Sequence, residues 1–168
     1  MEHVFFGFLC KIVNFSCRFP PELVEYIYTF SEAARMKIVV MADNRKNELL
    51  VNFCIAYRQL LSKHTLISLH NTATLLESAA DLNVVGLSTD YSGGFDQLAS
   101  RAEYNEIDSV IYLRDTQLAN YNEINPLLKA CDYNSIPYAT NLASAEILIL
   151  AIDRGDLDWR DLVRDSSF

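Results

Sequence analysis

Short apolar runs alternate with helical patterns along most of the chain, and this alternation restricts the fold more than any other feature. The runs that predict buried strands lie at residues 37–41, 66–69, 84–87, 109–113 and 138–140. The helical patterns lie at residues 48–63, 72–80, 95–104, 124–134 and 142–152. Strands that alternate with helices build parallel sheets covered on both faces. We therefore predict a single three-layer α/β domain with a five-stranded, mainly parallel sheet.

The residues before this pattern predict a separate N-terminal extension. Residues 1–35 are apolar and aromatic but interrupted by polar residues, so we expect neither a membrane span nor a signal peptide there. An apolar stripe with helical spacing follows Pro20, which predicts an amphipathic helix that packs on the main domain or on a neighbouring subunit. We assign the main domain to residues 36–168; the alternative is that the biological start is Met36.

Charge and cysteine content exclude several classes of protein. The 168-residue chain has a formal net charge of −8, and a binder of nucleic-acid polymers needs a basic surface instead. The four cysteines fit no metal motif, and Cys54 and Cys131 fall in apolar helical patterns typical of buried thiols. We therefore expect no metal, no cofactor and no membrane association. The free thiols indicate a reducing compartment, so we expect the protein to be cytoplasmic.

Small, polar and charged residues follow the predicted strands, at the edge where parallel sheets bind ligands. A tight loop with Gly93 and Gly94 is expected between the third strand and a helix that starts near Phe95. Glycine lets the backbone approach a bound group closely, and free N–H groups at a helix start attract anions. The residues at the other strand ends are Asp43 with Lys46, His70 to Ala73, Arg114 with Asp115, and Asn141. These residues therefore predict an anion-binding pocket at one edge of the sheet.

Five segments resemble a known family. They are KIVVMADNRKNELLVNF, GLSTDYSGGFDQ, YLRDTQ, CDYNSIPYATNLASAEILI and DRGDLDWRD. In this order they are similar to the H-D-x-x-K turn, the S-G-P-x-G-G-D-Q-Q loop, the F-x-R/W-D-P turn, the I-P-x-A-T-N-x-A-T-A-E segment and the C-terminal end of methylglyoxal synthases. That family eliminates phosphate from dihydroxyacetone phosphate. The resemblance implies the family's α/β fold and a homohexamer with pockets near the subunit contacts.

The resemblance also implies roles for individual positions, with a phosphate held by a lysine and by threonine, serine and glycine loops. The positions that keep the family's residue, or a close equivalent, are Asp43, Lys46, Thr72, Thr89, Gly93, Gly94, Asp115 and Asn141. Other positions depart from the pattern. Ala42 and Asn122 stand where the family has histidines. Phe95 stands where it has the catalytic aspartate, and Asp96 lies one residue late.

These departures bear on the chemistry of the site. Removing a proton from a carbon next to a carbonyl needs a base, and the resulting enediolate needs a hydrogen-bond donor. A benzyl ring takes no proton, and an amide donates a hydrogen bond but shuttles no proton. We therefore predict a pseudoenzyme, a non-catalytic binder that senses or sequesters its ligand. Tyr91, Phe95 and Tyr121 border the pocket, and because aromatic rings stack on flat rings, we expect a phosphorylated, nucleotide-derived small molecule.

Two alternatives remain open. One is an active lyase that uses Asp96, Asp43 or Asp115 as its base; the other is a structural paralogue whose pocket is empty. Among the remaining candidates, Arg45 and Arg114 can pair with phosphate, and His70 can donate a charge-assisted hydrogen bond. The full set of predicted ligand-binding residues is Asp43, Arg45, Lys46, His70, Asn71, Thr72, Thr89, Tyr91, Gly93, Gly94, Phe95, Arg114, Asp115, Tyr121, Asn122 and Asn141.

Overall fold

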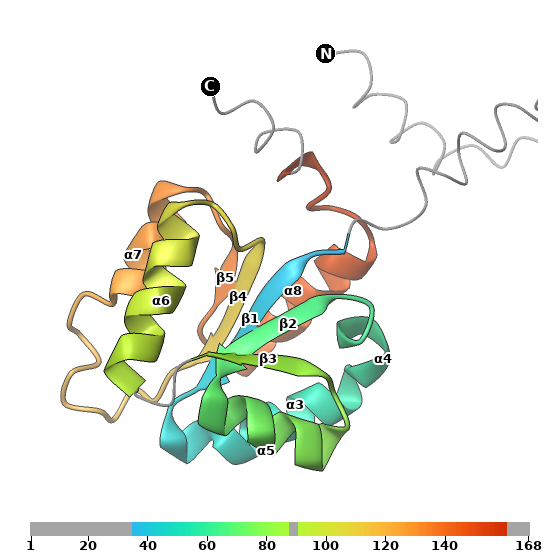
Figure 1. The fold of residues 1–168 in the computed structure, drawn as a ribbon, viewed down its shortest axis with the longest axis horizontal. Coiled ribbons are helices and arrows are strands. Elements are labelled where there is room, and N and C mark those ends of the chain that lie inside the picture. The colour runs from blue at the N-terminus through green and yellow to red at the C-terminus, as the bar shows by residue number, and fades with distance from the viewer. Residues whose placement is uncertain (1–34, 88–90, 161–168) are drawn as a thin grey trace, which may run out of the picture. The chain divides into compact units, whose positions relative to one another are not determined.

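The computed structural model describes residues 35–87 and 91–160, which form a parallel sheet between two layers of helices (Figure 1). The strands are β1 (Lys37–Ala42), β2 (Thr65–Leu69), β3 (Val84–Leu87), β4 (Ser109–Leu113) and β5 (Tyr138–Ala139). Their order is β3-β2-β1-β4-β5, and every pairing is parallel. The predicted three-layer α/β fold with a five-stranded sheet is confirmed, and the sheet is parallel throughout.

Helices cover both faces of the sheet. They are η1 (Asn44–Lys46), α3 (Asn47–Ala56), α4 (Arg58–Leu61), α5 (His70–Ala80), α6 (Tyr91–Glu103), α7 (Pro126–Tyr133) and α8 (Leu142–Asp153). Helices α3, α5 and α8 lie on one face, and α6 and α7 lie on the other (Figure 1). Side chains of a strand point alternately to the two faces. Accordingly, Ile38 and Val40 of β1 belong to the first core, and Val39 and Met41 belong to the second.

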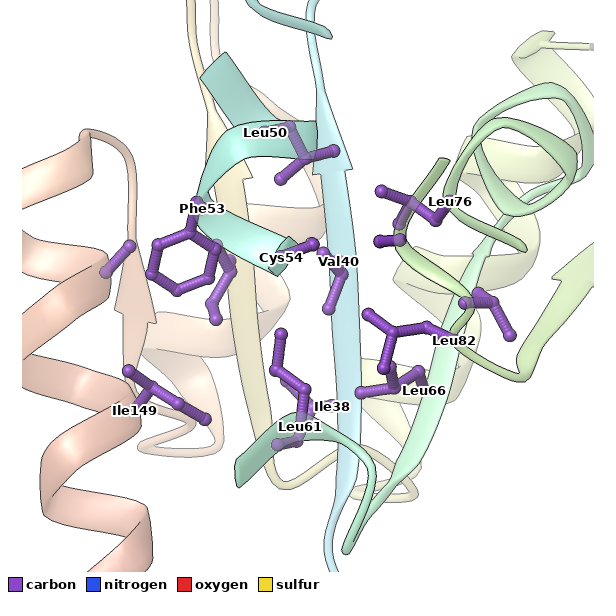
Figure 2. Packing of buried hydrophobic residues seen from close by; sticks show 14 of the residues in the cluster. Ile38, Val40, Leu50, Phe53, Cys54, Leu61, Leu66, Leu76, Leu82 and Ile149 are labelled. Atoms are coloured by element: carbon purple, nitrogen blue, oxygen red, sulfur yellow. The ribbon is translucent and has the colours of Figure 1, made fainter. Parts of the chain in front are cut away.

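The first core holds α3 and α5, whose first turns lie beside the carboxyl ends of the strands. Figure 2 shows Leu50 and Cys54 of α3, Leu76 of α5 and Ile149 of α8 around Val40, and all five side chains are fully buried. Burying an aliphatic side chain of this size contributes about 1.5–3 kcal/mol. Because α3 and α5 both pack on this core, the residues at their N-terminal ends have defined places beside the strand tips.

The single helix predicted over residues 48–63 is wrong. The structure has two helices there, α3 and α4, which are separated at Tyr57. The φ and ψ angles of Tyr57 are −105° and 18°, outside the α-helical range, while its ring packs on Phe53 with centroids 4.9 Å apart. Apolar residues on both sides of the break face the same core. The helical spacing therefore continues across the break, which explains why the pattern predicts one helix.

The predicted glycine loop is also wrong in part. Helix α6 begins at Tyr91, so Gly93 and Gly94 lie in its first turn, and residues 88–90 lie outside the described residues. Neither glycine has a positive φ; among the described glycines only Gly155 does, at 75°. Glycine has a low helix propensity, which favours a loop in a sequence pattern. The strand before residues 88–90 and the helix after them are as predicted, but the helix starts about one turn earlier than expected.

The predicted N-terminal extension, except for Arg35, lies outside the described residues. In the described part of the chain, no helix is both long enough and apolar enough to cross a membrane.

Candidate functional site

The carboxyl ends of β1 and β4 form the point from which the site is built. These neighbouring strands pair in register from Ile38↔Ser109 to Ala42↔Leu113. The chain continues from β1 to β2 and β3 on one side, whereas β4 and β5 lie on the other. Open α/β sheets bind ligands at such a reversal of strand order, beyond the carboxyl ends of the strands. Asp43 follows β1 directly, and Asp115 lies two residues beyond β4, so two carboxylates stand at this point.

Asp43 is held by hydrogen bonds to both of its carboxylate oxygens. The Tyr112 hydroxyl donates to Oδ1 at 2.6 Å, and the Asp115 backbone N–H donates to Oδ2 at 2.7 Å. Only 6% of the Asp43 surface is exposed. A buried carboxylate is stable when it is hydrogen-bonded in this way. Asp43 therefore ties the tip of β1 to β4 and to the residues that follow β4.

Asp115 has one occupied and one available carboxylate oxygen. Its Oδ1 accepts a hydrogen bond from the Gln117 backbone N–H at 3.1 Å. Its buried Oδ2 accepts no hydrogen bond, and the Arg45 Nη1 lies 3.4 Å away. Asp115 is 3% exposed, whereas the Arg45 side chain is 64% exposed. A solvent-exposed guanidinium therefore lies beside the free oxygen of a buried carboxylate.

Two cations follow β1 in the same short turn. The Lys46 backbone N–H donates to the Asp43 carbonyl at 2.7 Å, which closes the turn and places Arg45 and Lys46 in the last turn of η1. Lys46 is partly buried. Lysine and arginine side chains commonly bind phosphate groups. This turn therefore places two positive charges, which an anion could contact, next to Asp43 and Asp115.

The first turn of α5 provides a further set of polar groups. His70 and Asn71 are exposed and Thr72 is partly buried, directly after β2. The first N–H groups of a helix have no partner within the helix, so they attract anions. At Gly86 of β3, an added Cβ would lie 3.3 Å from the His70 Cα, so a larger residue there would press on the start of α5. All three predicted residues lie in the first turn of α5, which begins two residues before the helix predicted over residues 72–80.

Helix α6 brings Phe95 to the site and leaves Asp96 at the surface. The Phe95 ring meets the Tyr112 ring edge-on, with centroids 5.6 Å apart, and packs partly buried against the second core. Asp96 is exposed. Gly93 and Gly94 precede these residues in the first turn, the side chain of Tyr91 is not described, and Thr89 lies outside the described residues.

The segment after β4 is held by Arg114. Its guanidinium lies 4.4 Å from the Tyr121 ring centre, and its Nη2 donates to the Tyr121 carbonyl at 2.7 Å. One face of the Tyr121 ring is therefore occupied by a cation. Asn122 follows with an exposed side chain.

Asn141 acts at the start of α8. Its side-chain oxygen accepts a hydrogen bond from the Ser144 backbone N–H at 3.0 Å, as an N-cap does.

The reactive groups of the candidate site are the carboxylates of Asp43 and Asp115 and the neighbouring cations Arg45 and Lys46. Among the described residues, no group of three or more His, Cys, Asp or Glu side chains is placed to hold a metal ion.

Comparison with known proteins identifies the family. No protein-family model matches the chain. A curated methylglyoxal synthase of Caldicellulosiruptor saccharolyticus is 47% identical over 130 residues, which are 76% of this chain and 92% of that protein. The chain belongs to the methylglyoxal synthase family.

Further relatives agree with this assignment. Methylglyoxal synthases of Brevibacillus brevis and Clostridioides difficile are 37% and 39% identical, each over 79% of this chain and 98% of their own length. The crystal structure of methylglyoxal synthase from Elizabethkingia anophelis NUHP1 superposes with a TM-score of 0.63 at 26% identity, and covers 68% of this chain and 77% of that one. The predicted resemblance to methylglyoxal synthases is confirmed in sequence and in fold.

The prediction of a non-catalytic, nucleotide-binding protein is wrong. The relatives at 37–47% identity are named as methylglyoxal synthases, and nothing in the comparisons indicates a binder without activity. The aromatic residues on which that prediction depends also have other contacts. Phe95 packs on Tyr112, and Arg114 covers one face of Tyr121. Membership of the methylglyoxal synthase family favours the alternative of an active lyase.

Tyr112 is absent from the predicted site residues although it contacts two of them. It lies in a strand whose run of Val110, Ile111 and Leu113 is aliphatic, and the apolar pattern assigns the whole run to the core. The available signal is the Tyr112 hydroxyl, which lies one residue before the carboxyl end of an otherwise mainly aliphatic strand. Burying a hydroxyl is costly unless it finds a partner, so such a residue indicates a hydrogen bond to the site.

Proposed function

We propose that the chain is a lyase of the methylglyoxal synthase type, which eliminates phosphate from dihydroxyacetone phosphate and gives methylglyoxal. The observation that supports this most is the 47% identity to a methylglyoxal synthase over 92% of that protein. The geometry at the sheet edge is compatible with it, because two buried carboxylates lie beside two cations. Such an elimination needs a base and an anchor for the phosphate.

The phosphate binds beside η1 in this proposal. Lys46 supplies a point charge, and Arg45 turns from Asp115 towards the phosphate. The Arg45 side chain is 64% exposed, so solvent rather than packing surrounds most of it. The start of α5, with Thr72, supplies N–H and hydroxyl donors. Movement of Arg45 uncovers Oδ2 of Asp115, so binding of the phosphate frees the carboxylate oxygen that reacts.

Asp115 is the base in this proposal. Its Oδ2 accepts no hydrogen bond, whereas both oxygens of Asp43 already accept one. Asp96 is exposed and follows Phe95 on α6, where one residue turns the side chain by about 100° around the helix. Of the three carboxylates, Asp115 is therefore the one that is both fixed and available.

The reaction balances without a cofactor. Asp115 takes a proton from the hydroxymethyl carbon, and the electron pair of that C–H bond forms an enediolate with the neighbouring carbonyl. The phosphate then leaves from the methylene carbon on the other side of the former carbonyl, taking the electrons of its C–O bond, while the hydroxyl of the enediolate gives its proton to the leaving phosphate and becomes an aldehyde. The resulting enolate takes a proton from solvent on its methylene carbon and becomes methylglyoxal, and Asp115 returns its proton to solvent. The Asn122 amide is a donor that can stabilise the enediolate oxygen.

Asp115→Asn tests the assignment of the base. Asparagine keeps the size of the side chain and an oxygen for the Gln117 N–H, but it takes no proton. We expect kcat to fall by about 100- to 10,000-fold, the usual contribution of a general base. The measurement is the initial rate of methylglyoxal formation from dihydroxyacetone phosphate, with circular dichroism to verify folding.

Asp96→Asn is the matched control. Asp96 is an exposed carboxylate near the same site, and its amide variant should keep kcat within about twofold of the wild type. If Asp96→Asn abolishes turnover and Asp115→Asn does not, α6 supplies the base and the assignment to Asp115 is wrong.

A further inference from the structure

Tyr112 contacts both Phe95 of α6 and Asp43, one of the two carboxylates of the candidate site. Its ring meets the Phe95 ring at 5.6 Å between centroids, and its hydroxyl donates to Oδ1 of Asp43 at 2.6 Å. Tyr112 is 4% exposed and Asp43 is 6% exposed. The hydrogen bond therefore lies in a buried environment, where a hydrogen bond to a carboxylate is strong and a missing one is costly.

Through Asp43, the hydrogen bond from Tyr112 also restricts the orientation of Asp115. The second oxygen of Asp43 accepts the Asp115 backbone N–H at 2.7 Å, so one buried carboxylate bridges a side chain of β4 and the peptide that follows β4. If Asp43 rotates, it cannot keep the same geometry towards both donors. The orientation of Asp115, including its Oδ2, therefore depends on the bond from Tyr112.

We infer that Tyr112 is a positioning residue, whose hydroxyl fixes Asp43 and thereby the backbone and carboxylate of Asp115. As far as it concerns turnover, this inference rests on the proposed function, in which Asp115 is the base. The Tyr112 hydroxyl contacts Asp43, whereas the phosphate in the proposal is held by Lys46, Arg45 and the start of α5. Its loss should therefore change the chemical step and not the binding of the phosphate.

Tyr112→Phe removes only the hydroxyl and keeps the ring against Phe95. Oδ1 of Asp43 then loses the Tyr112 donor at a buried position. We expect kcat to fall about 10- to 100-fold, because a displaced catalytic group costs this much in rate. KM for dihydroxyacetone phosphate should stay within about twofold, because Lys46 and the start of α5 are unchanged. A purely structural role would lower thermal stability without this separation of kcat from KM.

A second readout does not need turnover. In ¹⁵N-labelled protein, the Asp115 amide proton reports its bond to Asp43, and in Tyr112→Phe its chemical shift should move and its exchange with solvent should become faster. Asp43→Asn should perturb the same amide proton, which provides a second variant if Tyr112→Phe folds poorly. Tyr133→Phe is the control, since Tyr133 is 87% exposed on α7; it should leave both readouts unchanged.

The two readouts separate the inference from the proposed function. If the wild-type protein forms no methylglyoxal, the proposed function is wrong. The response of the Asp115 amide proton to Tyr112→Phe then remains as the test of whether Tyr112 positions Asp115. An Asp115 amide that does not respond to Tyr112→Phe overturns the inference. In an active wild type, a responding amide with unchanged kcat overturns it too, because the hydroxyl would then be structural only. A responding amide with a lower kcat and an unchanged KM supports it.

Discussion

At the scale of single residues, Lys46 provides the most direct test of phosphate binding. It follows β1 in the same turn as Asp43 and is partly buried. Lys46→Ala should raise KM for dihydroxyacetone phosphate by about 10- to 100-fold, the value of one hydrogen bond between charged groups. kcat should change less than KM. The measurement is a substrate titration of the initial rate.

Lys63→Ala is the control for that variant. Lys63 also carries a charge and is 55% exposed, but it precedes β2 and so lies at the opposite edge of the sheet, where it pairs with Asp153. Its removal should leave KM unchanged. If Lys46→Ala behaves like Lys63→Ala, the phosphate binds elsewhere.

The residues of the site were predictable where polarity coincides with a strand end. Asp43, Lys46 and Asp115 follow strands that the apolar pattern defines, so their gathering at one edge follows from a parallel sheet. The contacts among them were not predictable. The Tyr112–Asp43 hydrogen bond joins residues 69 positions apart, and it depends on β4 lying next to β1 in a particular register.

At the scale of secondary-structure elements, Asn141 shows how a predicted ligand contact also has a structural role. Its side chain caps α8 through the Ser144 N–H. Asn141→Ala should lower the free energy of unfolding by about 1 kcal/mol, because the helix start loses its acceptor. Urea unfolding measures this change. Asn141→Asp keeps an acceptor oxygen and should retain most of the stability.

The same variant pair distinguishes the cap from a ligand contact. A cap predicts that KM for dihydroxyacetone phosphate stays near the wild-type value in Asn141→Ala. Unchanged stability together with a raised KM would show that Asn141 binds the substrate instead.

The element boundaries show which local signals mislead. All five strands were predicted to within one residue at each end, because short aliphatic runs are unambiguous when helices separate them. Helices were harder. The break at Tyr57 keeps its apolar spacing, and α6 continues through Gly93 and Gly94 despite their low helix propensity. The residues on both sides of Tyr57 and the later turns of α6 pack on the two cores, and a local pattern does not show this packing.

At the scale of the whole molecule, His64 makes stability depend on pH. Burial lowers the pKa of His64 below its usual 6.5, and the charge of nearby Lys63 lowers it further, while Asp153 opposes this shift. Its Nδ1 also accepts the Met36 backbone N–H at 3.4 Å, which requires the neutral ring. The unfolded chain therefore binds a proton more readily than the folded one. The contribution of His64 is complete above pH 6.5 and is lost as the pH falls below that value.

Unfolding in urea at pH 7.5 and pH 5.5 measures this effect. The wild type should lose more stability between these values than His64→Asn, by at most about 1.4 kcal/mol per pH unit. His70→Asn is the control, because His70 is exposed, and it should follow the wild type. Equal losses in the wild type and in His64→Asn would show that other groups cause the dependence.

The fold of the main domain was predictable because every level of the sequence agrees on it. The alternation of strands and helices gives the layers, and the five family-like segments are distributed from β1 to the residues that follow α8. The function was less predictable. Single substitutions such as Phe95 for aspartate suggest a lost activity, whereas similarity over most of the chain favours a retained one. A direct measurement of turnover decides between a lost and a retained activity.

That chemistry is measured directly by incubating the wild-type protein with dihydroxyacetone phosphate and quantifying methylglyoxal and inorganic phosphate. A protein-free sample gives the uncatalysed rate, and the Caldicellulosiruptor saccharolyticus methylglyoxal synthase provides a family member for comparison. We predict that both products form in equal amounts at a rate proportional to the protein concentration. Formation at the protein-free rate, under conditions in which the comparison protein turns over, would contradict the proposed lyase activity.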